Sequence, residues 1–181
     1  MKLNKLKILK NEELIRLVNF KDGLNLITNS IDNNRTGNGV GKSTLSRVLD
    51  FIFGANIDVI YSETEYKQAN TEIYNFFEKN NIIAELEFLD KNTTICSVSK
   101  TLSNKEDNIK YYINNNLTNK GEYYEFIKNN LFNLTSKTPT LREVLPKFIR
   151  NNSHRMQSTT NFLDKYTDDN KYLEIYLFFF G

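Results

Sequence analysis

The sequence predicts an α/β fold in which an antiparallel β lobe is flanked by helices. Residues 82–89 alternate between apolar and polar side chains, as a half-buried strand does, and residues 93–102 return after the turn-forming Asp90-Lys91-Asn92. A different period appears over residues 45–53, where apolar side chains recur at helical spacing before Gly54. The 181 residues have room for one domain, and we expect residues 1–181 to form a single unit.

The remaining elements follow in chain order. Strand-like runs occupy residues 3–9, 14–20 and 24–28, and Asp22-Gly23 between the last two predicts a hairpin. Residues 108–113 predict a third strand of the β lobe, closed by Asn114-Asn115-Asn116. Residues 122–131 then predict a helix with one apolar side formed by Tyr123, Phe126, Ile127 and Leu131.

Composition and charge exclude several classes of protein. Cys96, expected to be buried, is the only cysteine and His154 the only histidine, so neither an internal disulfide nor a cysteine–histidine metal cluster is expected. The net charge of +2 is too small to indicate a nucleic-acid interface by itself. Lys5 and Lys7 share one face of the first strand, which either meets phosphates or is simply solvated. Without a leader sequence or an apolar run that could cross a membrane, we expect a cytoplasmic protein.

A glycine-rich loop directly precedes the first predicted helix. Glycines let backbone N–H groups approach an anion closely, and the helix N-terminus adds a favourable dipole. Lys42 is expected to contact the β- and γ-phosphates of ATP, Ser43 to bind Mg²⁺, and Thr44 to contact the α-phosphate. Thr36 departs from the P-loop formula, which has glycine there; a turn without a ligand is the alternative. The predicted site comprises Thr36, Gly37, Asn38, Gly39, Val40, Gly41, Lys42, Ser43 and Thr44, with Arg35 as a further contact to the base or a phosphate.

Three sequence blocks in this order resemble the N-terminal head segment of the SMC, RecF, RecN and SbcC group of ABC-type ATPases. They are Gly23-Leu24-Asn25-Leu26-Ile27, the loop at residues 38–44, and Phe51-Ile52-Phe53-Gly54. The polar residues 29–35 before the loop are similar to RecN-like bacterial coiled-coil ATPases of poorly known function. Pro139-Thr140-Leu141-Arg142 and Phe148-Ile149-Arg150-Asn151 also resemble that family. The resemblance implies a P-loop NTPase of the ABC/SMC-head type with an antiparallel β lobe.

The same resemblance implies which parts of the active site are present. Gln157 is a candidate for the glutamine of the Q-loop, with Asn151 and Asn152 as alternatives. A Walker B segment and the Ser-Gly-Gly signature do not occur in the sequence, and in this family both come from a C-terminal half. Because the sequence stops after an apolar stretch at residues 172–181, we expect an N-terminal fragment or one half of a split ATPase.

The expected function is therefore ATP-dependent head dimerisation in DNA repair or anti-phage defence. The partners would be a second head or the C-terminal half, with DNA and other defence-complex subunits as further candidates. Hydrolysis is expected once the C-terminal half completes the site, whereas this chain alone would bind ATP with little turnover. Two alternatives stay open: a small P-loop kinase acting on a nucleotide or metabolite, and a non-hydrolysing, nucleotide-gated dimerisation module.

Overall fold

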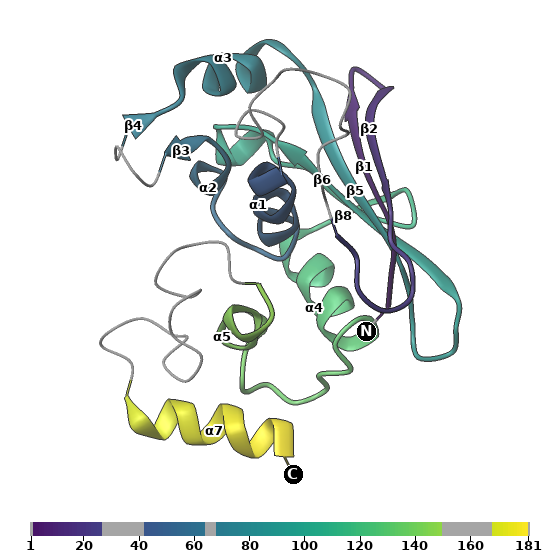
Figure 1. The fold of residues 1–181 in the computed structure, drawn as a ribbon, viewed down its shortest axis with the longest axis vertical. Coiled ribbons are helices and arrows are strands. Elements are labelled where there is room, and N and C mark those ends of the chain that lie inside the picture. Colours follow the sequence, from purple (N-terminus) through teal and green to yellow (C-terminus); the bar gives the residue numbers. More distant parts are fainter. Residues whose placement is uncertain (1, 27–41, 64–67, 150–167, 181) are drawn as a thin grey trace.

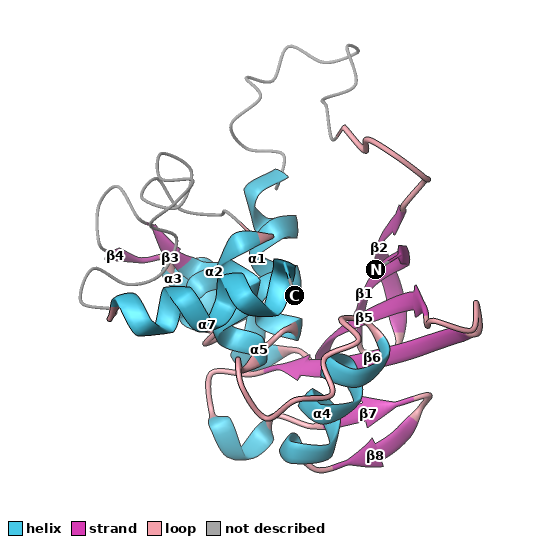
Figure 2. Cartoon of the chain, turned by 90° about the horizontal axis from the view of Figure 1, so that it is seen from below, coloured by secondary structure: helices cyan, strands magenta, loops and turns pink. Residues whose placement is uncertain are grey.

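The computed structural model describes residues 2–26, 42–63, 68–149 and 168–180, and it has an α/β fold (Figure 1). The helices gather on one side of the main sheet, as two perpendicular views show (Figures 1 and 2). The helices are α1 (Lys42–Ile52), α2 (Asp58–Tyr61), α3 (Thr71–Lys79), α4 (Lys120–Asn130), α5 (Leu141–Val144) and α7 (Asp169–Phe180). Short 3₁₀ turns occupy Glu106–Asn108 and Leu145–Lys147.

The main sheet is antiparallel throughout, with the order β2-β1-β5-β6-β7-β8. Its strands are β1 (Lys2–Lys10), β2 (Glu13–Asn19), β5 (Ile82–Leu89), β6 (Ile95–Leu102), β7 (Tyr111–Ile113) and β8 (Asn116–Thr118). A separate two-stranded sheet pairs β3 (Ser62–Glu63) with β4 (Gln68–Ala69). The predicted α/β class with an antiparallel β lobe is confirmed, and so are the strands expected at residues 3–9, 14–20, 82–89 and 93–102.

The third predicted strand, residues 24–28, is wrong where it can be checked. Residues 24–26 are not in a strand, and residues 27 and 28 lie outside the described residues. Instead of a hairpin at Asp22-Gly23 there is a compact turn, in which the Asn25 side chain accepts from the Lys21 N–H and donates to the Lys21 carbonyl, both at 2.8 Å. Leu24 is 83% exposed, so within the described part of the chain no neighbouring strand buries this run.

Asparagines close the two tight turns of the sheet. The β1–β2 hairpin turns at Asn11 and Glu12, with φ of 50° and 73°. Asn114 and Asn115 have φ of 48° and 65°, which suits a two-residue hairpin, so Asn116 begins β8 rather than ending a loop. The predicted strand at residues 108–113 is shorter than expected because Asn108 ends a 3₁₀ turn.

The core lies between the helix-facing side of the sheet and α1 and α4. Strand β5 alternates as predicted, with Ala84, Leu86 and Phe88 fully buried, and the buried Cys96 of β6 pairs with Phe88. The helices contribute a second apolar layer, in which the most deeply buried side chains are Val48, Phe51, Ile52, Tyr123 and Ile127. This packing holds α1 against the sheet from Leu45 onward.

The opposite face of the sheet carries ion pairs, and the expected choice between a phosphate-contacting and a solvated face at Lys5 and Lys7 is not tested. Lys7 Nζ lies 2.7 Å from Glu85 Oε1 and also contacts Glu87, while Lys5 lies 3.7 Å from Glu87. Hydrogen bonds to Glu85 and Glu87 raise the pKa of Lys7. These cross-strand pairs form because β1 lies beside β5, a neighbour about 80 positions away that local sequence does not reveal.

Helix α7 covers the α5 region rather than the sheet. Lys171 Nζ lies 3.0 Å from Glu143 of α5, and the rings of Phe148 and Phe179 meet edge to face with centroids 5.6 Å apart. Ile175 is its fully buried residue, whereas Phe180 is exposed. In the described ranges, no helix combines the length and the apolar character that spanning a membrane requires.

Candidate functional site

The predicted nucleotide loop meets the described structure at the start of α1. Residues Arg35 to Gly41 and Gln157 lie outside the described residues, and the helix begins with Lys42. Ser43 is exposed in the first turn and Thr44 is half-buried. The first N–H groups of any helix lack an intrahelical acceptor, so this end of α1 has the polarity that an anion favours.

The other end of α1 closes as the sequence predicts. Gly54 has a φ of 104°, a conformation that glycine adopts without strain. The Ala55 N–H donates to the Asp50 carbonyl at 2.9 Å and the Gly54 N–H to the Phe51 carbonyl at 3.0 Å, which together make a Schellman motif. An added Cβ at Gly54 would lie 3.2 Å from Tyr124, so the glycine also allows α4 to approach closely.

An ion pair between a buried carboxylate and a partly exposed arginine joins α1 to α5. Arg142 Nη1 donates to Asp50 Oδ1 at 2.6 Å, and Asp50 is 2% exposed. Arg142 is held by the first turn of α5, where Thr140 and Glu143 form a reciprocal capping box. Burial alone would raise the pKa of Glu143, but the hydrogen bonds from Thr140 and Lys171 outweigh it, and the pKa is lowered.

Lys100 is the most unusual charged residue of the described structure. It lies on β6 facing the helices and is 3% exposed. Its Nζ donates to the Phe51 carbonyl at 3.1 Å and to Tyr124 Oη at 3.0 Å, and it lies 3.6 Å from the centre of the Phe51 ring. Burial, with smaller contributions from the charges of Lys120 and Arg142, lowers the pKa of Lys100 to about 7.

Sequence reasoning missed Lys100, although a signal was present. Along β6 the residues that face the core are Cys96, Val98, Lys100 and Leu102, so a lysine occupies an apolar phase of the strand. A charge at such a position is rarely left without a role in packing or binding. The alternation of core-facing residues along β6 could have identified Lys100 as buried, but it could not have revealed the contacts with Phe51 and Tyr124.

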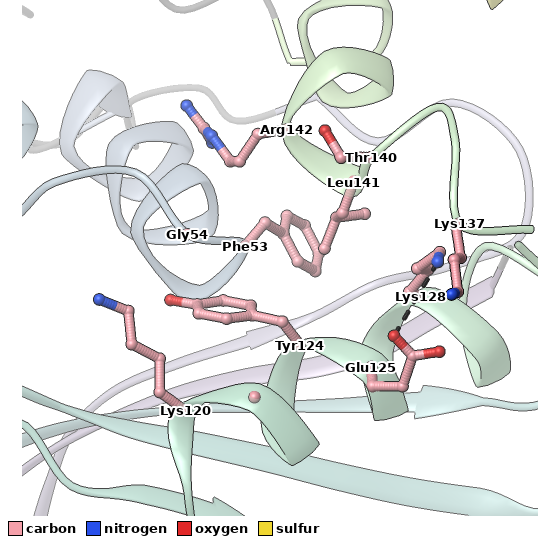
Figure 3. Close-up of a pocket in the computed structure, with 11 residues that line it drawn as sticks. Phe53, Gly54, Lys120, Tyr124, Glu125, Lys128, Lys137, Thr140, Leu141 and Arg142 are labelled. Atoms are coloured by element: carbon pink, nitrogen blue, oxygen red, sulfur yellow. Dashed lines mark ion pairs between the residues drawn. The ribbon is translucent and has the colours of Figure 1, made fainter.

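A pocket of about 440 Å³ lies beside this cluster, between the end of α1, α4 and the start of α5 (Figure 3). Four cationic side chains line it, together with the single carboxylate of Glu125; the cations are Lys120, Lys128, Lys137 and Arg142. A smaller cavity of about 270 Å³ shares Gly54, Lys120 and Tyr124 with this pocket and also includes Lys100 and Glu106.

Groups of three or more histidine, cysteine or carboxylate side chains able to hold a metal ion do not occur within the described ranges. The Mg²⁺ contact expected of Ser43 needs no such cluster, because a P-loop supplies one hydroxyl and the nucleotide supplies phosphate oxygens. Comparison of the chain with protein-family models and with curated proteins finds no match.

Proposed function

We propose that this chain binds ATP and Mg²⁺ through residues 36–44, as the N-terminal half of an ABC-type ATPase head similar to those of the SMC and RecN group. The observation that carries the proposal is the segment Gly-Val-Gly-Lys-Ser-Thr, whose last three residues begin α1. Backbone donors, one cation and one hydroxyl then meet at a helix N-terminus, which is the set of groups a triphosphate with Mg²⁺ requires.

Helix α1 is suited to hold such a loop in place. The Schellman motif at Gly54 and the Asp50–Arg142 ion pair fix its far end. Val48 and Ile52 are buried against the sheet. A helix that is buried from Leu45 onward gives its first turn a defined direction, and preorganised donors bind an anion at a smaller entropic cost.

The proposal also includes a second polypeptide segment that completes the site. The sequence contains no run of apolar residues ending in Asp-Glu, so it supplies no Walker B carboxylate to polarise the attacking water. On β2, at one edge of the sheet, Leu14, Ile15 and Leu17 are about half exposed, and Leu24 and Leu26 beyond it are more so. Apolar residues gathered at a strand edge favour a covering partner, here the C-terminal half or a second head.

Without that carboxylate, the chain by itself is expected to bind ATP with little hydrolysis. The same observation favours a second candidate, a nucleotide-gated dimerisation module that never hydrolyses ATP. A role in DNA repair or defence enters only through the resemblance of the head segment. Turnover by the chain together with its C-terminal half separates the two candidates, since only the ATPase would release phosphate.

Calorimetric titration of ATP with Mg²⁺ into the wild type and into Lys42→Ala tests the site. Losing a charge-assisted contact of about 1.5–3 kcal/mol should weaken binding roughly 10- to 100-fold. Lys91→Ala, at an exposed turn, serves as the matched control and should bind like the wild type. Equal affinity of Lys42→Ala and the wild type would show that the loop does not hold the phosphates.

A further inference from the structure

We propose that the pocket between α1, α4 and α5 binds a phosphomonoester carried on an aromatic or apolar small molecule, at a site separate from the predicted nucleotide loop. The pocket lies at the C-terminal end of α1, where Gly54 is one of its lining residues, whereas the loop precedes the N-terminal end. The inference does not depend on ATP binding, because it uses different residues.

The charge of the pocket is the first observation. Its lining carries four cations against one carboxylate. Three of the cations have a carboxylate partner, and these pairs join Lys120 to Glu106 at 2.7 Å, Arg142 to Asp50 at 2.6 Å and Lys128 to Glu125 at 3.9 Å. Lys137 is exposed and pairs with no carboxylate of the described structure.

Lys100, which donates to Tyr124 Oη and lines the second cavity, adds a fifth cation. Its described contacts are a carbonyl, a hydroxyl and an aromatic ring, none of which carries a full negative charge. Four pocket cations thus face three carboxylates, and Lys100, whose pKa is lowered to about 7, adds a part of one further charge, so the excess around Tyr124 is between one and two positive charges at neutral pH. A phosphomonoester carries about −1.5 to −2 charges near neutral pH, so it would balance this excess more fully than a single carboxylate would.

The arrangement of the lining suits a ligand with two chemically different parts. Figure 3 shows Lys120 and Arg142 at one end of the pocket, Lys128 and Lys137 at the other, and the rings of Phe53 and Tyr124 between them. Arginine and lysine are the side chains that proteins use for phosphate, and aromatic rings accept flat apolar groups. The volume of about 440 Å³ is within the range of small-molecule sites.

The start of α4 supplies further polar groups. Lys120 and Gly121 are the first two residues of the helix, and both line the pocket. The Asn119 cap accepts from the Glu122 N–H, and the Asn119 carbonyl accepts from Tyr123. The N–H groups of residues 120 and 121 have no acceptor within the helix, because the first turn of a helix offers none.

The test is a calorimetric titration of phenyl phosphate, with inorganic phosphate and the neutral benzyl alcohol as comparison ligands. The variant Lys120→Gln/Lys137→Gln removes two exposed cations from the pocket. The control Lys21→Gln/Lys91→Gln removes two exposed cations from turns elsewhere. We expect saturable binding of phenyl phosphate, tighter than that of either comparison ligand, weakened about tenfold or more by the pocket variant and less than twofold by the control.

The proposal would be overturned by no saturable binding of phenyl phosphate, by equal weakening by both double variants, or by equally tight binding of benzyl alcohol. Binding that disappears in Lys42→Ala would also overturn it, because the ligand would then occupy the nucleotide loop. If a 5′-phosphorylated trinucleotide binds more tightly than phenyl phosphate, the proposed small-molecule ligand is wrong and the pocket binds the phosphorylated end of a nucleic acid. If thermal melting shows that the double variant is unfolded, Lys137→Gln alone provides the same comparison.

Discussion

Replacing Lys100 with methionine should make the fold more stable at neutral pH and below. Methionine has a similar length and no charge, so it fills the same space without a buried ammonium. Lys100 is 3% exposed, and its pKa is lowered from 10.5 to about 7 by burial, with Lys120 and Arg142 adding to the effect. The charged form is therefore disfavoured in the folded state.

The magnitude follows from the two pKa values. A group with a pKa of 10.5 in the unfolded chain and about 7 in the fold destabilises the charged folded state by about 5 kcal/mol, at about 1.4 kcal/mol per pKa unit. Between pH 7 and 10.5 the unfolded chain binds more protons, so the stability of the wild type should rise with pH in this window. Methionine loses the contacts with Phe51 and Tyr124, which offsets about 1–3 kcal/mol.

The assay is urea unfolding of the wild type and Lys100→Met at several pH values from 6 to 9.5. The advantage of the variant should be about 2–4 kcal/mol at pH 6 and should shrink by about 3 kcal/mol towards pH 9.5. Lys91→Met, at an exposed turn, is the matched control and should show no comparable trend. A difference between Lys100→Met and the wild type that stays constant to within about 1 kcal/mol would refute the reasoning.

Two further substitutions test how α1 is held. Gly54→Ala should lower the free energy of unfolding by about 2–3 kcal/mol, because φ is 104° and the new Cβ would lie 3.2 Å from Tyr124. Gly23→Ala is the control, because Gly23 has a φ of 81° but open space around it, and it should cost only about 1 kcal/mol. Equal losses of stability in the two alanine variants would show that the contact of the new Cβ with Tyr124 does not matter. Arg142→Met should cost about 1.5–3 kcal/mol in the same urea assay, since the buried Asp50 carboxylate loses the charge-assisted hydrogen bond from Arg142. The double variant Arg142→Met/Asp50→Asn should recover part of the lost stability. If Arg142→Met alone lowers the free energy of unfolding by less than about 1 kcal/mol, the ion pair contributes little to stability.

Local periodicity accounts for what the sequence predicted correctly. The alternation in residues 82–89 matches the burial of β5 residue by residue, and the helical spacing before Gly54 matches α1. The helix predicted at residues 122–131 corresponds to α4, which begins two residues earlier and ends one residue earlier. Each of these signals lies inside a single element, so it needs no information about distant neighbours.

Errors arose where the outcome depended on a partner far along the chain. The run at residues 24–28 has the composition of a strand, but a strand also needs a neighbour, and residues 24–26 have none in the described structure. The ion-pair partners of Lys5 and Lys7 could not be identified from the sequence, because Glu85 and Glu87 belong to the distant strand β5. The turn at Asn114 and Asn115 was recognised, but the short strand β8 after it was not.

By itself, the sequence determined the chemistry of the predicted nucleotide loop, because residues 36–44 bring donors, a cation and a hydroxyl together by chain connectivity alone. The tertiary structure alone decided the basic pocket. Lys100, Lys120 and Arg142 come from three separate elements, and they gather around Tyr124 only once α1 and α4 pack on the sheet. The free energy of packing offsets the repulsion between these like charges, and a local sequence pattern does not show how these two contributions compare.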